Sequence, residues 1–159
     1  AQGFSPQTAA LMFVLPMAVL TLFNLVAAPI LRIGVPVPML FILSVGIQTA
    51  FWFALPALGP ISAGIGGLVI YAAAAGITPT CLFALPGTIY GVENAGSRSY
   101  GVLMTGRNLG VLSGPLLAGV LVHLTGGWDI VPPVLGAAGL VAIASAVLLH
   151  FRLQRTATA

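Results

Sequence analysis

The sequence has very little charge. It contains five arginines, no lysine and two acidic residues, so charged residues make up 4% of its 159 positions. A soluble domain carries roughly a quarter charged residues. Between Ile33 and Val92 there is no Asp, Glu, Lys, Arg or His, and one membrane helix needs only about 20 apolar residues. A water-facing surface cannot be built from so few charges. The sequence therefore predicts a protein that crosses a membrane several times.

Reactive groups are also scarce. The single Cys81 allows no internal disulfide and no thiolate metal site, so it is interpreted as an apolar packing residue. The apolar segments contain no carboxylate, no paired histidines and no phosphate-binding loop with a lysine. Five scattered arginines form no patch for nucleic acid. We expect no enzyme activity, no catalytic residues, no metal and no cofactor.

Apolar residues make up 59% of the chain, and turn and breaker residues divide them into segments. The predicted fold class is all-α, a polytopic helical membrane protein with a single transmembrane region over residues 1–159. Its five predicted spans cover about 8–31, 38–55, 62–90, 100–123 and 130–151.

The arginines predict the orientation. If five spans alternate in direction, four arginines outside the spans fall on one side, and Arg107 enters the membrane from that side. Arginine excess marks the cytoplasmic face. We therefore expect a multi-pass protein of the cell membrane, with the N-terminus of this segment outside and its C-terminus in the cytoplasm. The four arginines are Arg32, Arg98, Arg152 and Arg155.

The composition of the spans predicts their surroundings. The second and fifth spans carry bulky or aliphatic residues all round, which suits helices that face lipid. The first, third and fourth carry the polar and breaker residues, and we expect them to face protein or a cavity.

The fourth span contains GRNLGVLSGPLLAG, residues 106–119, in which Gly110, Gly114 and Ala118 share a face with Arg107. Small residues four apart let a second membrane helix approach closely. This face is therefore predicted to pack against protein. Arg107 either extends to the cytoplasmic interface or lines a substrate path, and Asn108 points elsewhere and is expected to bond a neighbouring helix.

The third span contains Gly76 and Pro79, which predict a helix kink. Tyr71 and Thr78 are seven residues apart and form a polar stripe on one face, as transporters often use around a binding site. Asn24 lies in the first span. These three residues and Arg107 are the candidate substrate-pathway residues, although an ordinary packing role explains each of them as well.

The stretch from Gly91 to Trp128 resembles the region of the tenth and eleventh helices of major facilitator superfamily transporters. That family has an acidic residue and an arginine in the cytoplasmic loop, then G-x-x-x-G-P and an outer GGW. In this sequence the pattern is met in order by Glu93, Arg98, Gly101, Gly110, Gly114, Pro115, Gly119, Gly126, Gly127 and Trp128. Residues 3–19 also resemble the start of the family's eighth helix. After the first span, Arg32-Ile33-Gly34 lacks the acidic residue and second arginine of the family's fuller motif.

The resemblance implies that the chain is the last five of twelve helices, that its partners are the missing N-terminal helices and the bilayer, and that it moves a small solute by alternating access. Arg107 favours an anionic solute. Two alternatives remain open: a self-contained membrane assembly or anchoring subunit, and a subunit of an oligomeric channel. Nothing in the sequence identifies the substrate or the coupling ion.

Overall fold

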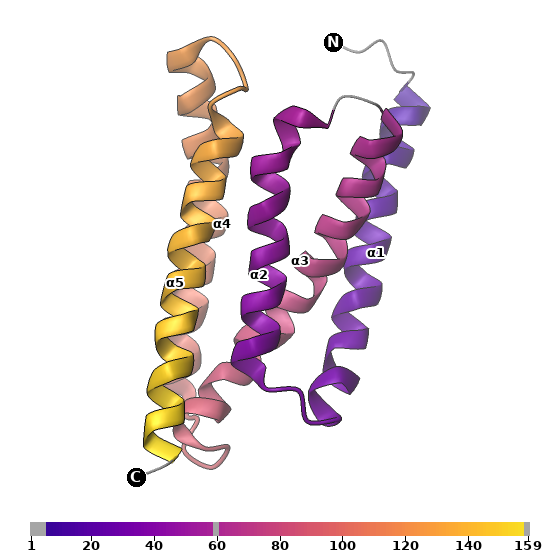
Figure 1. Ribbon diagram of the computed structural model, residues 1–159. Helices are drawn as coiled ribbons and strands as arrows, with labels where there is room; N and C mark the ends of the chain where they lie inside the picture. Colours follow the sequence, from indigo (N-terminus) through magenta and orange to yellow (C-terminus); the bar gives the residue numbers. More distant parts are fainter. Residues whose placement is uncertain (1–5, 59–60, 158–159) are drawn as a thin grey trace.

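The computed structural model describes residues 6–58 and 61–157. Over these residues the chain forms five long α-helices that alternate in direction (Figure 1). A short 3₁₀ helix follows the second of them at Leu55–Ala57. The α-helices are α1 (Pro6–Arg32), α2 (Val37–Ala54), α3 (Ile61–Tyr90), α4 (Ser97–Thr125) and α5 (Val131–Ala157).

All five α-helices are long and apolar enough to cross a membrane. This confirms the prediction of a polytopic all-α membrane protein within the described residues. The predicted ends agree with the structure to within three residues, except that α5 continues to Ala157 rather than ending near residue 151. The extension carries Arg152 and Arg155, whose charges had marked the end of the span.

Glycines shape the sharp turns between the helices. Gly91 follows α3 with a φ of 79°, and Gly126 follows α4 with a φ of 75°. Side chains with a Cβ rarely adopt this left-handed conformation, and glycine adopts it without strain. At Gly126 the backbone N–H bonds the carbonyl of Val122, which caps α4 and lets the chain turn back toward α5.

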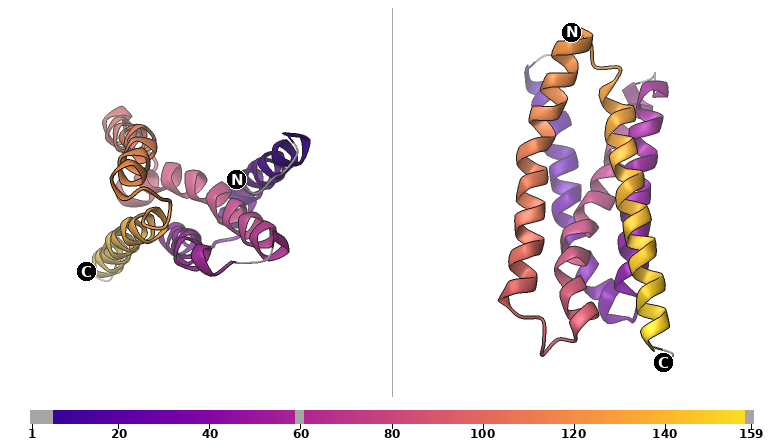
Figure 2. Two further views of the ribbon diagram at one scale, coloured as in Figure 1. Left: turned by 90° about the horizontal axis from the view of Figure 1, so that it is seen from above. Right: turned by 90° about the vertical axis from the view of Figure 1, so that its left-hand side faces the viewer.

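Four helices form a packed row in the order α1, α3, α2, α5, with extensive contacts between neighbours. Seen along the helices, α3 runs across the middle of the bundle, with α1 at one end and α5 toward the other (Figure 2). The fifth helix, α4, makes only sparse contacts with α3 and α5. The bundle is therefore a four-helix unit with one loosely attached helix.

This arrangement differs from the expectation that α2 faces lipid and α4 packs against protein. A third of the apolar window of α2 is buried, and none of the window of α4 is buried. α2 packs on two sides because small and polar residues occur on the faces it turns toward α3 and α5. The packing partner expected for α4 is absent from the described part of the chain.

Candidate functional site

The backbones of α1 and α3 are in direct contact where the two helices cross at Gly76. A Cβ atom added at Gly76 would collide with the backbone carbonyl oxygen of Leu20 and would lie 3.1 Å from the backbone nitrogen of Asn24. Only glycine permits this backbone contact. Gly76 was predicted as part of a kink, and the structure shows it as a packing residue.

Hydrogen bonds join the same two helices. Asn24 donates from Nδ2 to the carbonyl oxygen of Gly76 at 3.2 Å, and the Thr80 hydroxyl donates to the carbonyl oxygen of Asn24 at 3.3 Å. Pro79 lies between Gly76 and Thr80 and has no N–H to give to the helix. α3 nevertheless stays helical through Pro79. The proline leaves the carbonyl of Ala75 without its helical donor, and Asn24 donates to the next carbonyl, that of Gly76.

The opposite side of this stretch of α3 is bonded to α2. Gln48 donates from Nε2 to the Thr78 hydroxyl at 2.7 Å and to the carbonyl oxygen of Ser44 at 3.2 Å. The hydroxyls of Thr78 and Ser44 lie 3.1 Å apart. Ser44 is buried. These three side chains form a polar cluster that holds α2 against α3 next to Pro79.

Tyr71 also faces α2. Its ring lies against Phe51, with ring centroids 4.9 Å apart, and meets Trp52 edge-on at 5.8 Å. Aromatic pairs at such separations stabilise packing beyond the area they bury. The polar stripe of Tyr71 and Thr78 that the sequence predicted is therefore turned toward α2 rather than toward an open cavity.

A second pair of glycines brings α5 against α2. A Cβ at Gly136 would come within 2.8 Å of the Phe53 ring, and one at Gly139 would collide with the Thr49 hydroxyl. Thr49 is buried and donates its own hydroxyl to the carbonyl oxygen of Val45 at 2.8 Å. Small residues on α5 thus accommodate larger side chains of α2.

α4 presents the opposite situation. Cβ atoms added at Gly110 or Gly114 would meet nothing within 4 Å. Gly114 and Ala118 are partly covered and line a pocket of about 570 Å³ together with side chains of α2 and α5. The small-residue face predicted for close packing therefore has no close neighbour among the described residues.

Arg107 is exposed, and no described residue forms an ion pair or hydrogen bond with it. α4 begins at Ser97 rather than near residue 100, so Arg107 lies ten residues, about 15 Å, along the helix. The predicted span, which begins at about residue 100, places Arg107 only seven residues, or about 10 Å, along it. Arg107 therefore lies about 5 Å further from the start of its helix than those boundaries imply. Asn108 is exposed as well and has no partner in the described chain.

The structure brings three of the four predicted pathway residues onto the contacts of α3. Asn24 contacts it from α1, and Tyr71 and Thr78 contact α2 from it. Arg107 stands apart on α4. Their predicted roles in a substrate path stay predictions, whereas their packing contacts are observed.

Sequence reasoning missed Ser44, Gln48 and Thr49. A signal was present, because Ser44 and Gln48, four residues apart in an otherwise apolar span, mark one helix face that needs a partner, and Thr49 marks a second. No group of three or more His, Cys, Asp or Glu side chains within the described residues is placed to hold a metal ion.

Comparison of the chain with models of protein families, with curated proteins and with solved structures gives no match. The fold itself defines the class, which is a multi-pass helical membrane protein.

Proposed function

We propose that this chain is part of a secondary active transporter of the major facilitator type. It moves a small solute, an organic anion, across the cell membrane by alternating access. The observation that carries the proposal is Arg107, a cation without a partner in the described residues on a helix long enough to span the membrane. The resemblance of residues 91–128 to the family's tenth and eleventh helices supports the same proposal.

The energetics of Arg107 favour a negatively charged neighbour. A lone arginine near the centre of a membrane helix is unfavourable by at least about 3 kcal/mol on insertion scales. The only two carboxylates in the sequence, Glu93 and Asp129, flank α4 at its opposite ends. A counter-charge at the depth of Arg107 therefore comes from outside this chain. An anionic solute that passes along α4 provides one.

The uneven packing also supports transport. α1 and α3 are joined by backbone contact and hydrogen bonds, α3 and α2 by hydrogen bonds, and α5 packs its glycines against side chains of α2. α4 is loosely attached. Alternating access requires one packed unit to move against another. The open face of α4 fits a bundle in which further helices, the missing part of the same transporter, complete the wall of the solute path.

An antibody raised against residues 152–159 tests the first part of this proposal. On membranes of the source cells, it should detect a protein far longer than 159 residues. Purified with that antibody and reconstituted in liposomes, the same protein should exchange labelled organic acids in a counterflow assay. A product of 159 residues, or a full-length product without exchange of any organic anion, would argue for an assembly or channel subunit.

A further inference from the structure

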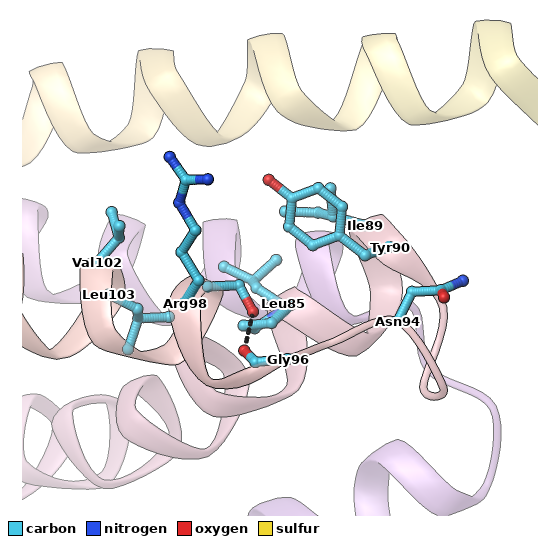
Figure 3. A pocket seen from close by; sticks show the side chains of 10 residues that line it. Leu85, Ile89, Tyr90, Asn94, Gly96, Arg98, Val102 and Leu103 are labelled. Atoms are coloured by element: carbon cyan, nitrogen blue, oxygen red, sulfur yellow. Dashed lines mark hydrogen bonds between the residues drawn. The ribbon is translucent and has the colours of Figure 1, made fainter.

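A pocket opens where α3 ends and α4 begins. It has a volume of about 700 Å³, and the loop between the two helices closes its end. Tyr90 and Arg98 extend from the same side of the pocket, toward the ribbon of α5 (Figure 3). Neither side chain has a hydrogen-bond or ion-pair partner among the described residues. None of the predicted solute-path residues lines this pocket. The lining residues are Leu85, Pro86, Ile89, Tyr90, Asn94, Gly96, Arg98, Ser99, Val102 and Leu103.

The lining changes from polar to apolar along the helices. The end next to the loop carries Tyr90, Asn94 and Arg98. Leu85 and Leu103 lie five residues further along their helices, about 8 Å deeper in the membrane. A ligand of this pocket therefore has a polar end at the membrane interface and an apolar part below it.

The charge on this end of the bundle indicates the charge of the ligand's polar end. The loop between α3 and α4, the turn after α1 and the end of α5 lie at the same end of the molecule (Figure 1). These segments and the helix ends beside them contain four arginines and one acidic side chain, Glu93. At the pocket itself α4 is preceded by Gly96, which has no side chain to accept a hydrogen bond from the N–H groups of the first turn. The loop end of the pocket is thus a basic site that attracts anions.

We propose that this pocket binds one anionic phospholipid. Arg98 and the Tyr90 hydroxyl hold its phosphate, and one acyl chain lies against Leu85, Ile89 and Leu103. A soluble phosphate would leave the apolar floor empty, whereas a lipid occupies both parts. The proposal depends only on insertion in a membrane and is independent of the transport function.

Native mass spectrometry of the delipidated chain in detergent tests the site. Titration with dioleoylphosphatidylglycerol should give one saturable adduct, and dioleoylphosphatidylcholine should bind more weakly. An arginine near an anionic surface contributes roughly 1 kcal/mol, so Arg98→Gln should weaken phosphatidylglycerol binding about fivefold. Arg98→Lys should retain most of the affinity because it keeps the charge.

Arg32→Gln is the matched control, since Arg32 ends α1 at the same face of the membrane but outside the pocket. It should leave the affinity unchanged. Circular dichroism and phosphatidylcholine binding show whether each variant is folded. Equal binding of the two lipids, or undiminished phosphatidylglycerol binding by folded Arg98→Gln, would overturn the proposal. Displacement of phosphatidylglycerol by millimolar inorganic phosphate would show that the site recognises phosphate rather than lipid.

Discussion

Asn24 of α1 and Gly76 of α3 are joined twice, by a hydrogen bond and by direct backbone contact. The Asn24 amide donates to the carbonyl oxygen of Gly76, and the backbone before Asn24 fills the space that a side chain at position 76 would take. Close backbone approach and interhelical hydrogen bonds are two of the forces that join helices in lipid, where no hydrophobic effect drives them together. This junction fixes α1 against α3 at Pro79.

Replacing Gly76 by alanine should therefore weaken the bundle. The added methyl group must displace the carbonyl of Leu20, which belongs to the backbone and cannot rotate away. We expect a loss of about 1–3 kcal/mol in the free energy of unfolding, as for overpacked cores. Unfolding of the purified chain by sodium dodecyl sulfate, followed by circular dichroism, measures it.

Gly110→Ala is the control, because a Cβ at Gly110 meets nothing within 4 Å. It should leave the unfolding curve in place or shift it slightly toward greater stability, since alanine favours the helix. Equal effects of the two substitutions would show that the contact at Gly76 contributes nothing.

The polar cluster between α2 and α3 gives a second prediction. Thr78→Val keeps the shape of the side chain but removes the hydroxyl that accepts from Gln48. We expect a loss of about 0.5–2 kcal/mol, the range measured for hydrogen bonds between membrane helices. Thr88→Val is its control, because Thr88 bonds only the carbonyl of Ala84 in its own helix. If Thr88→Val destabilises the chain as much, the loss comes from the threonine hydroxyl itself and not from the contact with α2.

The orientation in the membrane can be tested with single cysteines in a Cys81→Ala background. Ser97→Cys lies at the start of α4, and Asp129→Cys lies in the turn after it; both positions are exposed. Position 126 is unsuitable, because a cysteine there would be strained at a φ of 75°. A membrane-impermeant maleimide should label position 129 from outside the cell and position 97 only after permeabilisation. Labelling of both in intact cells contradicts the five-span topology.

The helices could be predicted from the sequence because lipid imposes a simple rule on them. Every backbone group must be bonded within its own segment, so long apolar runs between breakers become helices. The sequence predicts an end of α5 near residue 151 because Arg152 and Arg155 follow, whereas the helix continues to Ala157. A helix continues past the apolar region where nothing stops it, and charged residues do not stop a helix.

The packing was harder to predict, because small residues show where a helix can be approached but not which helix approaches. Gly110 and Gly76 look alike in the sequence, yet only Gly76 meets another backbone in the structure. The bulky residues of α2 predict a helix that faces lipid. Its contacts depend instead on Gln48 and Thr49, whose partners Thr78 and Gly139 lie far along the chain.

The open face of α4 separates the stability of this chain from its assembly. Gly114→Leu adds a large side chain where the described residues leave space. The isolated chain should tolerate it, with an unfolding curve near that of the parent. If further helices pack on this face, the same substitution in the full-length protein should lower its yield as a monodisperse species in size-exclusion chromatography. Loss of stability already in the isolated chain would show that the face packs within these 159 residues.

The role of Arg107 in transport is tested by three variants of the full-length protein. Arg107→Gln removes the charge and should reduce uptake of an organic anion at equal membrane abundance, because no other cation of this chain lies within a described span near that depth. Arg107→Lys keeps the charge but loses the two-pronged geometry with which a guanidinium binds a carboxylate. If Arg107 binds the solute, lysine should restore uptake only in part, mainly through a raised KM. If Arg107 only extends to the interface, lysine serves as well as arginine, and uptake by Arg107→Lys should match the wild type.

Asn108→Ala, one residue along on a different face of α4, is the control and should leave KM unchanged. Wild-type uptake kinetics for Arg107→Gln would exclude Arg107 from the solute path.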